Sequence, residues 1–189
     1  MAISDQPAER HRQITARFTD RVRGTTAWDA PAPVAGWTAR DVVRHLTDWF
    51  PGFLAAGADI DLPHGSSVDD DPVSTWQVHS DAVQAVLDDP ETEARQFTNQ
   101  HIGTLPLATA IDQFYTTDVF MHTWDLSRAT AQDDRLDPDL CATLLGGMEQ
   151  MEQIIRSSGQ YGPRVEVPSD ADAQTRLLGF IGRDPSWTP

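Results

Sequence analysis

Apolar residues recur at intervals of three and four along most of the chain, and this spacing predicts α-helices. The stripe is clearest where Val42, Leu46 and Trp49 follow Thr38, a residue type that commonly caps a helix N-terminus. Pro51 is expected to kink or end this second helix, because a proline inside a helix removes one backbone hydrogen bond. Besides the helix that begins at Thr38, the pattern predicts helices over residues 7–23, 72–87, 106–130, 138–157 and 171–181.

The segments between the predicted helices carry few signs of β-structure. Residues 57–71 are polar and contain glycine and proline, which favours a loop. A short extended piece is allowed at residues 96–101, and the last helix is expected to be capped by Ser169 or Asp170. Several helices of similar length with so few strand signals predict an all-α bundle.

Length and charge narrow the classes of protein to consider. The 189 residues suit one domain that spans residues 1–189. The formal net charge is −15, from 14 arginines, no lysine and 29 acidic residues. Such a surface repels phosphate groups, so we expect neither a nucleic acid nor an anionic membrane as a partner.

The cysteine content and the N-terminal residues predict the cellular compartment of the protein. The first residues are polar, with no apolar block behind a basic region, so we expect no secretory signal. No apolar run reaches the roughly 20 residues of a membrane-spanning helix. The single cysteine, Cys141, cannot form an internal disulfide, and its apolar neighbours indicate a buried side chain. These observations predict a cytoplasmic protein.

The sequence Asp-Val-Phe-Met-His inside the fourth predicted helix is the strongest candidate for chemistry. Its Asp118 and His122 are four residues apart, so both point from one helix face and can share a metal ion. His45 lies beside the apolar stripe of the second helix and is the best third ligand. The alternatives are a surface hydrogen bond between His122 and Asp118, and a core position for His45.

Two imidazoles and one carboxylate suit Zn²⁺ best, with Ni²⁺ or Fe²⁺ as alternatives, and leave a coordination position for water or a substrate. Asp125 lies three residues beyond His122 and is expected to orient that histidine. The alternative for Asp125 is a solvated carboxylate or an ion pair with Arg128. Trp49 and Trp124 could wall a pocket beside the ligands.

The remaining histidines lie in polar or loop contexts. His11, His64 and His79 are therefore expected at the surface. His101 precedes a glycine in the irregular region and could reach the mouth of the site, although nothing in the sequence requires it.

Three segments resemble a known family. WTARDVVRHLTDW, TTDVFMHTWDLSRAT and LLGFIGRDPSW are similar to motifs of the mycothiol-dependent maleylpyruvate isomerase N-terminal-like proteins, in the DinB-like superfamily. The resemblance runs from about Trp28 to Trp187. It implies an up-down-down-up four-helix bundle with a short extra C-terminal helix. It also implies that His45, Asp118 and His122 are the metal ligands.

The resemblance also has two departures. Relatives with thiol chemistry commonly carry glutamate where this chain has Asp118, which leaves the identity of the metal open. The isomerase of the family has a further C-terminal domain that contributes to its active site, whereas this chain ends soon after the bundle. We therefore expect the family's metal site in this chain, but we do not expect maleylpyruvate as its substrate.

Three functions fit the sequence. The first is a metal-dependent transferase or isomerase that activates a low-molecular-weight thiol such as mycothiol towards a small electrophile. The second is a non-catalytic metal-binding module with a closed four-ligand site. The third is a metal-dependent hydrolase, for which Asp125 is the available general base. Either a monomer or a homodimer is compatible with each function.

Overall fold

The computed structural model describes residues 2–157 and 159–189, and most of them are helical. None of the described helices combines the length and the apolar character that crossing a membrane would require. The elements, in chain order, are α1 (Pro7–Gly24), α2 (Ala39–Ala58), α3 (Pro72–Asp88), the 3₁₀-helix η1 (Pro90–Ala94), β1 (Gln96–Asn99), β2 (Gly103–Pro106), α4 (Leu107–Ala110), the π-helix η2 (Ile111–Thr116), α5 (Thr117–Ala129), α6 (Pro138–Gln150), α7 (Glu152–Ser157) and α8 (Ala173–Phe180).

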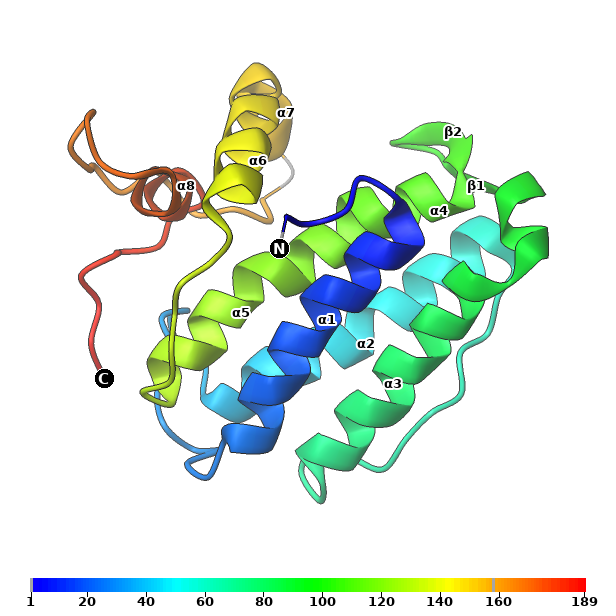
Figure 1. Cartoon of the computed structure of the whole chain (residues 1–189), viewed down its shortest axis with the longest axis horizontal. Coiled ribbons are helices and arrows are strands. Elements are labelled where there is room, and N and C mark those ends of the chain that lie inside the picture. The colour runs from blue at the N-terminus through cyan, green and yellow to red at the C-terminus, as the bar shows by residue number, and fades with distance from the viewer. Residues whose placement is uncertain (1, 158) are drawn as a thin grey trace.

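Four helices form the bundle: α1, α2, α3 and α5. Helix α1 packs against α3 and α5, and α2 packs against the same two helices on the other side. Helices α1 and α5 run in one direction and α2 and α3 in the other, with residues 59–71 returning along the length of the bundle (Figure 1). The up-down-down-up arrangement expected of a DinB-like fold is confirmed.

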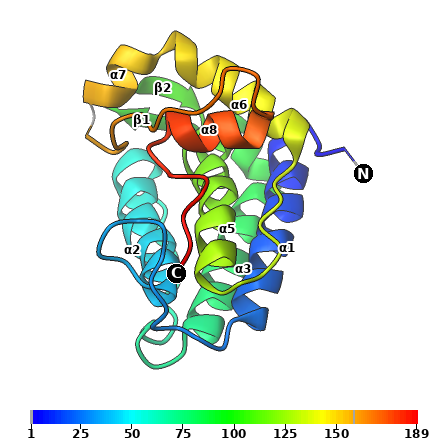
Figure 2. The same cartoon turned by 90° about the vertical axis from the view of Figure 1, so that its left-hand side faces the viewer.

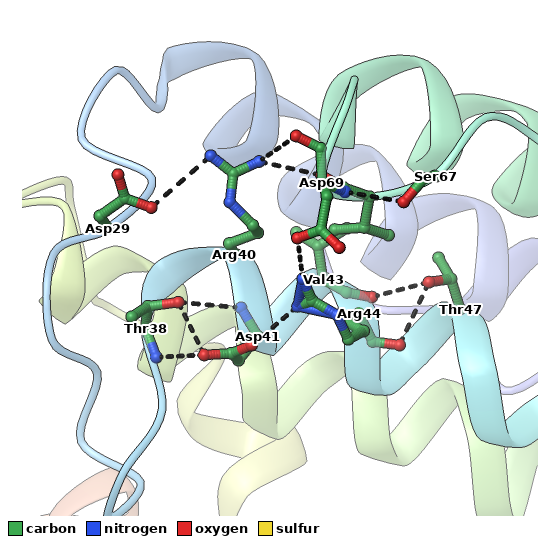
Figure 3. A network of polar contacts seen from close by, with 10 residues as sticks. Asp29, Thr38, Arg40, Asp41, Val43, Arg44, Thr47, Ser67 and Asp69 are labelled. Carbon is green, nitrogen blue, oxygen red and sulfur yellow. Dashed lines mark hydrogen bonds and ion pairs between the residues drawn. The ribbon is translucent and has the colours of Figure 1, made fainter.

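The start of α2 is fixed by a network of polar side chains (Figure 3). The hydroxyl of Thr38 accepts a hydrogen bond from the backbone N–H of Asp41, and the Asp41 carboxylate accepts one from the Thr38 N–H. This reciprocal pair satisfies two N–H groups that a helix start otherwise leaves free. Arg44 then pairs with Asp41 at 2.7 Å and with Asp69 of the following loop. The predicted cap at Thr38 is confirmed.

Pro51 does not end α2, which continues to Ala58. The proline removes one backbone hydrogen bond, but Phe50 and Leu54 on either side of it are fully buried. Packing in the core therefore holds the helix together across the missing bond.

The helix predicted over residues 106–130 is one helical stretch with an interruption. Helix α4 leads into η2, where the backbone N–H of Thr117 bonds to the carbonyl of Asp112, five residues back. Helix α5 follows, and its residues 119–127 are all buried. A helix buried on every side lies at the centre of its fold.

The chain after α5 covers the bundle. Figure 2 shows α6, α7 and α8 at one end, with the last residues running along the outside between α2 and α5. The helix predicted over residues 138–157 is divided at Met151 into α6 and α7, and α7 contacts the rest of the molecule through the partly buried Ile155 and through Arg156, which donates to the carbonyl of Phe180. The cap of α8 is Asp172, which accepts from the Thr175 N–H, rather than Ser169 or Asp170.

The short extended piece predicted at 96–101 is the first half of a hairpin. Strands β1 and β2 pair antiparallel, with Phe97 opposite Leu105. Phe97 is fully buried and stacks on Phe53 of α2, which ties the hairpin to the bundle.

Candidate metal centre

The structure brings His45, Asp118 and His122 together at the interface of α2 and α5. One ligand atom from each of the three side chains lies within 4.8 Å of the others. The Nε2 atom of His45 is 3.0 Å from Oδ2 of Asp118, and Nε2 of His122 is 3.4 Å from Oδ1 of the same carboxylate. Both imidazoles thus turn the same nitrogen towards the carboxylate.

Helix geometry explains this convergence. Asp118 and His122 stand one turn apart on α5, directly after the π-helical turn, so their side chains share a face. Helix α2 packs against α5 and presents His45 from the opposite side. The π-helical turn lies directly before Asp118, and such turns are common near functional sites.

The donor set fits a divalent metal ion. Two donors held tetrahedrally at about 2.0–2.1 Å from one ion lie about 3.4 Å apart. The histidine nitrogens lie 3.0 and 3.4 Å from the two different oxygens of Asp118, and one donor atom from each residue lies within 4.8 Å of the others. Imidazole and carboxylate donors suit Zn²⁺, Ni²⁺ and Fe²⁺. The residues present can therefore hold such an ion.

Two tryptophans flank the centre on the α2 side. The indole N–H of Trp49 donates to Oδ2 of Asp118 at 3.1 Å, so Trp49 both walls the site and orients a ligand. Trp37, in the loop before α2, stacks on His122 with ring centroids 5.7 Å apart and also contacts the His45 ring. Sequence periodicity did not identify Trp37, because a loop residue belongs to no helical stripe.

Behind the ligands lies a buried ion pair. Oδ2 of Asp125 is 2.8 Å from Nδ1 of His122, as expected for a carboxylate that orients a histidine. The partner of Asp125 is Arg183, whose Nε and Nη2 each donate to the carboxylate at 2.9 Å, and not Arg128. Arg128 instead pairs with Asp134. Arg183 was not found from the sequence, since 58 residues separate it from Asp125.

Burial and the neighbouring charges shift the pKa values of Asp125 and His122 in opposite directions. Burial alone would raise the pKa of Asp125, but the hydrogen bonds and charges of His122 and Arg183 outweigh it, and the pKa is lowered. Burial would lower the pKa of His122, whereas the neighbouring Asp118 and Asp125 outweigh that effect and raise it. Asp125 is therefore a carboxylate anion held between two donors.

The site is closed on one side and open on the other. The side chain of His122 is only 6% exposed, while that of His45 is 32% exposed. Tyr161, from the segment before α8, lies close by, and burial together with the charge of Asp118 raises its pKa to about 12. Solvent therefore reaches this group of residues from the His45 side.

The other histidines differ from expectation. His11 and His79 are buried rather than at the surface, because the faces of α1 and α3 that carry them point into the bundle against Tyr115. His64 is exposed, as expected. His101 is exposed on the β-hairpin, hydrogen-bonded to Gln100, and does not belong to the metal-binding group in the described chain.

Two further expectations concern apolar positions. Cys141 is buried in α6, as expected, and burial raises the pKa of its thiol to about 12. Trp124 is buried in the core beneath Arg128, so it does not wall an open pocket.

Comparison with known proteins places the chain in a family. The family described as the mycothiol maleylpyruvate isomerase N-terminal domain matches residues 11–127. The chain belongs to this family. The matched region contains His45, Asp118, His122 and Asp125, whereas Arg183 lies outside it.

Comparison with individual proteins adds two distant relatives. Two uncharacterized proteins of Mycobacterium tuberculosis, from strains CDC 1551 / Oshkosh and ATCC 25618 / H37Rv, are each 25% identical to the chain over 166 residues. The alignment covers 81% of this chain and 83% of each relative. No solved structure gives a significant match. The names of these relatives carry no statement about the reaction.

Proposed function

We propose that this protein binds one divalent metal ion through His45, Asp118 and His122, and activates a low-molecular-weight thiol such as mycothiol towards a small electrophile. The observation that carries the proposal is the convergence of three ligand atoms within 4.8 Å at a site that is partly open. Membership in a family named for a mycothiol-dependent isomerase supports a thiol as the cosubstrate.

A metal ion at such a site supplies Lewis acidity, which lowers the pKa of a thiol and makes its sulfur nucleophilic at neutral pH. The chain would contribute the rest. Trp49 and Asp125 fix the orientations of Asp118 and His122 by hydrogen bonds. Arg183 balances the charge of Asp125, so the ligands supply a single uncompensated negative charge, that of Asp118. The centre therefore retains positive charge with a divalent ion, which favours an anionic sulfur.

An exogenous thiol is required because the chain does not provide one of its own. Cys141 is the only cysteine, it lies in α6, and its pKa is raised to about 12 by burial. A thiol in that environment remains protonated at neutral pH and is a poor nucleophile.

The two alternative functions have less support. A closed structural site needs a fourth protein ligand, and within residues 2–157 and 159–189 no further histidine, cysteine or acidic residue joins the group. A hydrolase needs a general base at the reacting atoms. Asp125 is 1% exposed and both of its oxygens accept from Arg183, so it is not free to take a proton from a substrate.

The test is a titration of the Co²⁺-loaded protein with mycothiol, followed by the visible ligand-field absorption of the metal. We expect the bands to change and to saturate, because sulfur entering the open position alters the ligand field. S-methylated mycothiol is the matched control, since it differs by one methyl group and cannot supply a thiolate. Unchanged bands at saturating mycothiol would refute the thiol role while leaving the metal site standing.

A further inference from the structure

The chain beyond α8 reaches the back of the metal centre through a defined turn. Helix α8 ends with the N–H of Arg183 bonded to the carbonyl of Leu178 and the N–H of Gly182 bonded to that of Gly179. This pair of bonds is the Schellman motif, with a left-handed residue just past the helix end. Gly182 has a φ of +85° there, a conformation that L side chains rarely adopt.

Space as well as conformation requires glycine at this turn. A Cβ atom at Gly182 would lie 2.9 Å from the carbonyl oxygen of Pro163 and 3.0 Å from Cα of Gly162. The turn is thus packed against the segment that precedes α8. Arg183 follows directly, so its direction is set by a turn that has little freedom to move.

Arg183 holds Asp125 with two hydrogen bonds of 2.9 Å each, in the fork geometry that matches a carboxylate. Oδ2 of Asp125, one of these two acceptors, is also 2.8 Å from Nδ1 of His122. The carboxylate is 1% exposed, so water does not compete for it. The orientation of the His122 ring is thereby linked, through Asp125, to the C-terminal turn.

We propose that Arg183 is a positioning residue of the metal centre. By fixing the Asp125 carboxylate, it keeps the proton of His122 on Nδ1 and leaves Nε2 facing Asp118 and His45. This inference rests on the proposed function, since it assumes that the three side chains bind a metal ion. It makes the centre depend on a segment outside residues 11–127, the part of the chain that matches the family.

Removing Arg183 should weaken metal binding without removing a ligand. Partners that hydrogen-bond a metal-bound histidine typically contribute 10- to 100-fold to metal affinity. We therefore expect Arg183→Gln to lower Co²⁺ affinity by at least about tenfold and to change the visible absorption of the bound Co²⁺. The affinity is measured by competition with a chelator, and the spectrum on the fully loaded protein.

The matched control is Arg128→Gln. Arg128 also holds the C-terminal segment, by donating to the carbonyl of Pro185, but it does not contact Asp125. If Arg128→Gln binds Co²⁺ as tightly as the wild type does while Arg183→Gln binds it more weakly, the effect is specific to the Asp125 contact. Equal weakening in both variants would show general loosening of the segment and would overturn the inference.

Folding and function can be separated in the same experiment. Circular dichroism of the metal-free variants checks the fold. If Arg183→Gln fails to fold because the buried Asp125 has lost its arginine partner, Arg183→Gln combined with Asp125→Asn removes both charges and takes its place. Wild-type affinity and an unchanged spectrum in the folded variant would overturn the inference. Failure of the wild type itself to bind Co²⁺ would instead refute the proposed function.

Discussion

At the scale of single residues, Asp118 contacts both histidines of the candidate metal centre. Its two oxygens face the two histidines, and Oδ2 also accepts from the indole N–H of Trp49. A hydrogen bond from a further group restricts the rotation of this carboxylate more than the two imidazoles do alone. Trp49 is the described residue that does so through a hydrogen bond from the α2 side.

Trp49→Phe should therefore weaken metal binding about fivefold, because it removes one hydrogen bond worth about 1 kcal/mol and keeps an aromatic ring in place. Chelator competition with Zn²⁺ measures the effect. Trp37→Phe is the control, since the Trp37 ring stacks on His122 and gives no hydrogen bond to the carboxylate. Equal affinities in the wild type and Trp49→Phe would contradict the orienting role.

Cys141 offers a second prediction at this scale. Because its thiol is buried and its pKa is about 12, iodoacetamide at neutral pH should modify the folded protein very slowly and the urea-unfolded protein rapidly. Mass spectrometry reads the extent of modification. Cys141→Ala should leave the response of the Co²⁺ bands to mycothiol unchanged. Loss of that response would mean that Cys141, rather than the added thiol, acts at the metal.

The residues that the sequence revealed share a simple property. Asp118 and His122 are a helical pair four apart, and His45 lies beside a clear apolar stripe, so local spacing was enough to select them. Arg183 and Trp37 act from loops and turns, where no periodicity exists. Their roles depend on tertiary contacts that only the folded chain displays.

At the scale of elements, the interior between α1, α3 and η2 contains two histidines. His11 donates or accepts through Nδ1 at 2.8 Å from the Thr116 hydroxyl, and His79 packs edge-on against Tyr115. Burial lowers the pKa of His11 to about 3, with a smaller effect of His79, and burial lowers that of His79 to about 4. Both rings are therefore neutral in the folded protein at neutral pH.

These pKa values predict that acid destabilises the bundle. The unfolded chain takes up the proton near pH 6.5 and the folded chain only near pH 3–4, so the stabilisation is complete above about 6.5 and is lost as the pH falls. We expect His11 and His79 each to lower the free energy of unfolding by about 1–2 kcal/mol when the pH falls from 7.5 to 5. Urea unfolding of the metal-free protein at these two pH values measures the loss.

Variants assign the effect to the two buried rings. His79→Gln should reduce the difference in stability between the two pH values, even if it lowers stability at both. His101→Gln, at an exposed position of the hairpin, should leave the difference unchanged. A wild-type difference that persists in His79→Gln and His11→Gln would show that other groups cause the acid sensitivity.

The elements themselves were predictable where patterns are local. The bounds of α1 and α3, the cap of α2 and the presence of an all-helical bundle follow from spacing and capping residues. The π-helical turn η2 and the continuation of α2 through Pro51 do not, because packing in the core decides them. His11 and His79 were assigned to the surface because their polar neighbours concealed which face is buried.

At the scale of the whole molecule, the candidate metal site is built from separate parts of the chain. Helix α2 provides one of the three candidate ligands, α5 provides two, and the segment after α8 provides the arginine of the ion pair behind them. A bound ion should therefore stabilise the folded protein as a unit. At a free metal concentration 100 times the Kd, the expected gain is about 2.7 kcal/mol. Thermal unfolding with and without Zn²⁺ measures this gain.

His45→Ala is the comparison for that experiment. The side chain of His45 is about one third exposed, so its removal should change the stability of the metal-free protein little. Its Zn²⁺-dependent rise in melting temperature should be smaller than in the wild type. An equal rise in both proteins would place the stabilising ion elsewhere.

The most direct test of the account is elemental analysis of the purified wild-type protein beside His122→Ala. The account predicts close to one equivalent of a divalent transition metal per chain in the wild type and only traces in the variant, with both proteins folded. Equal trace amounts in both, or an undiminished content in His122→Ala, would contradict a metal centre at His45, Asp118 and His122.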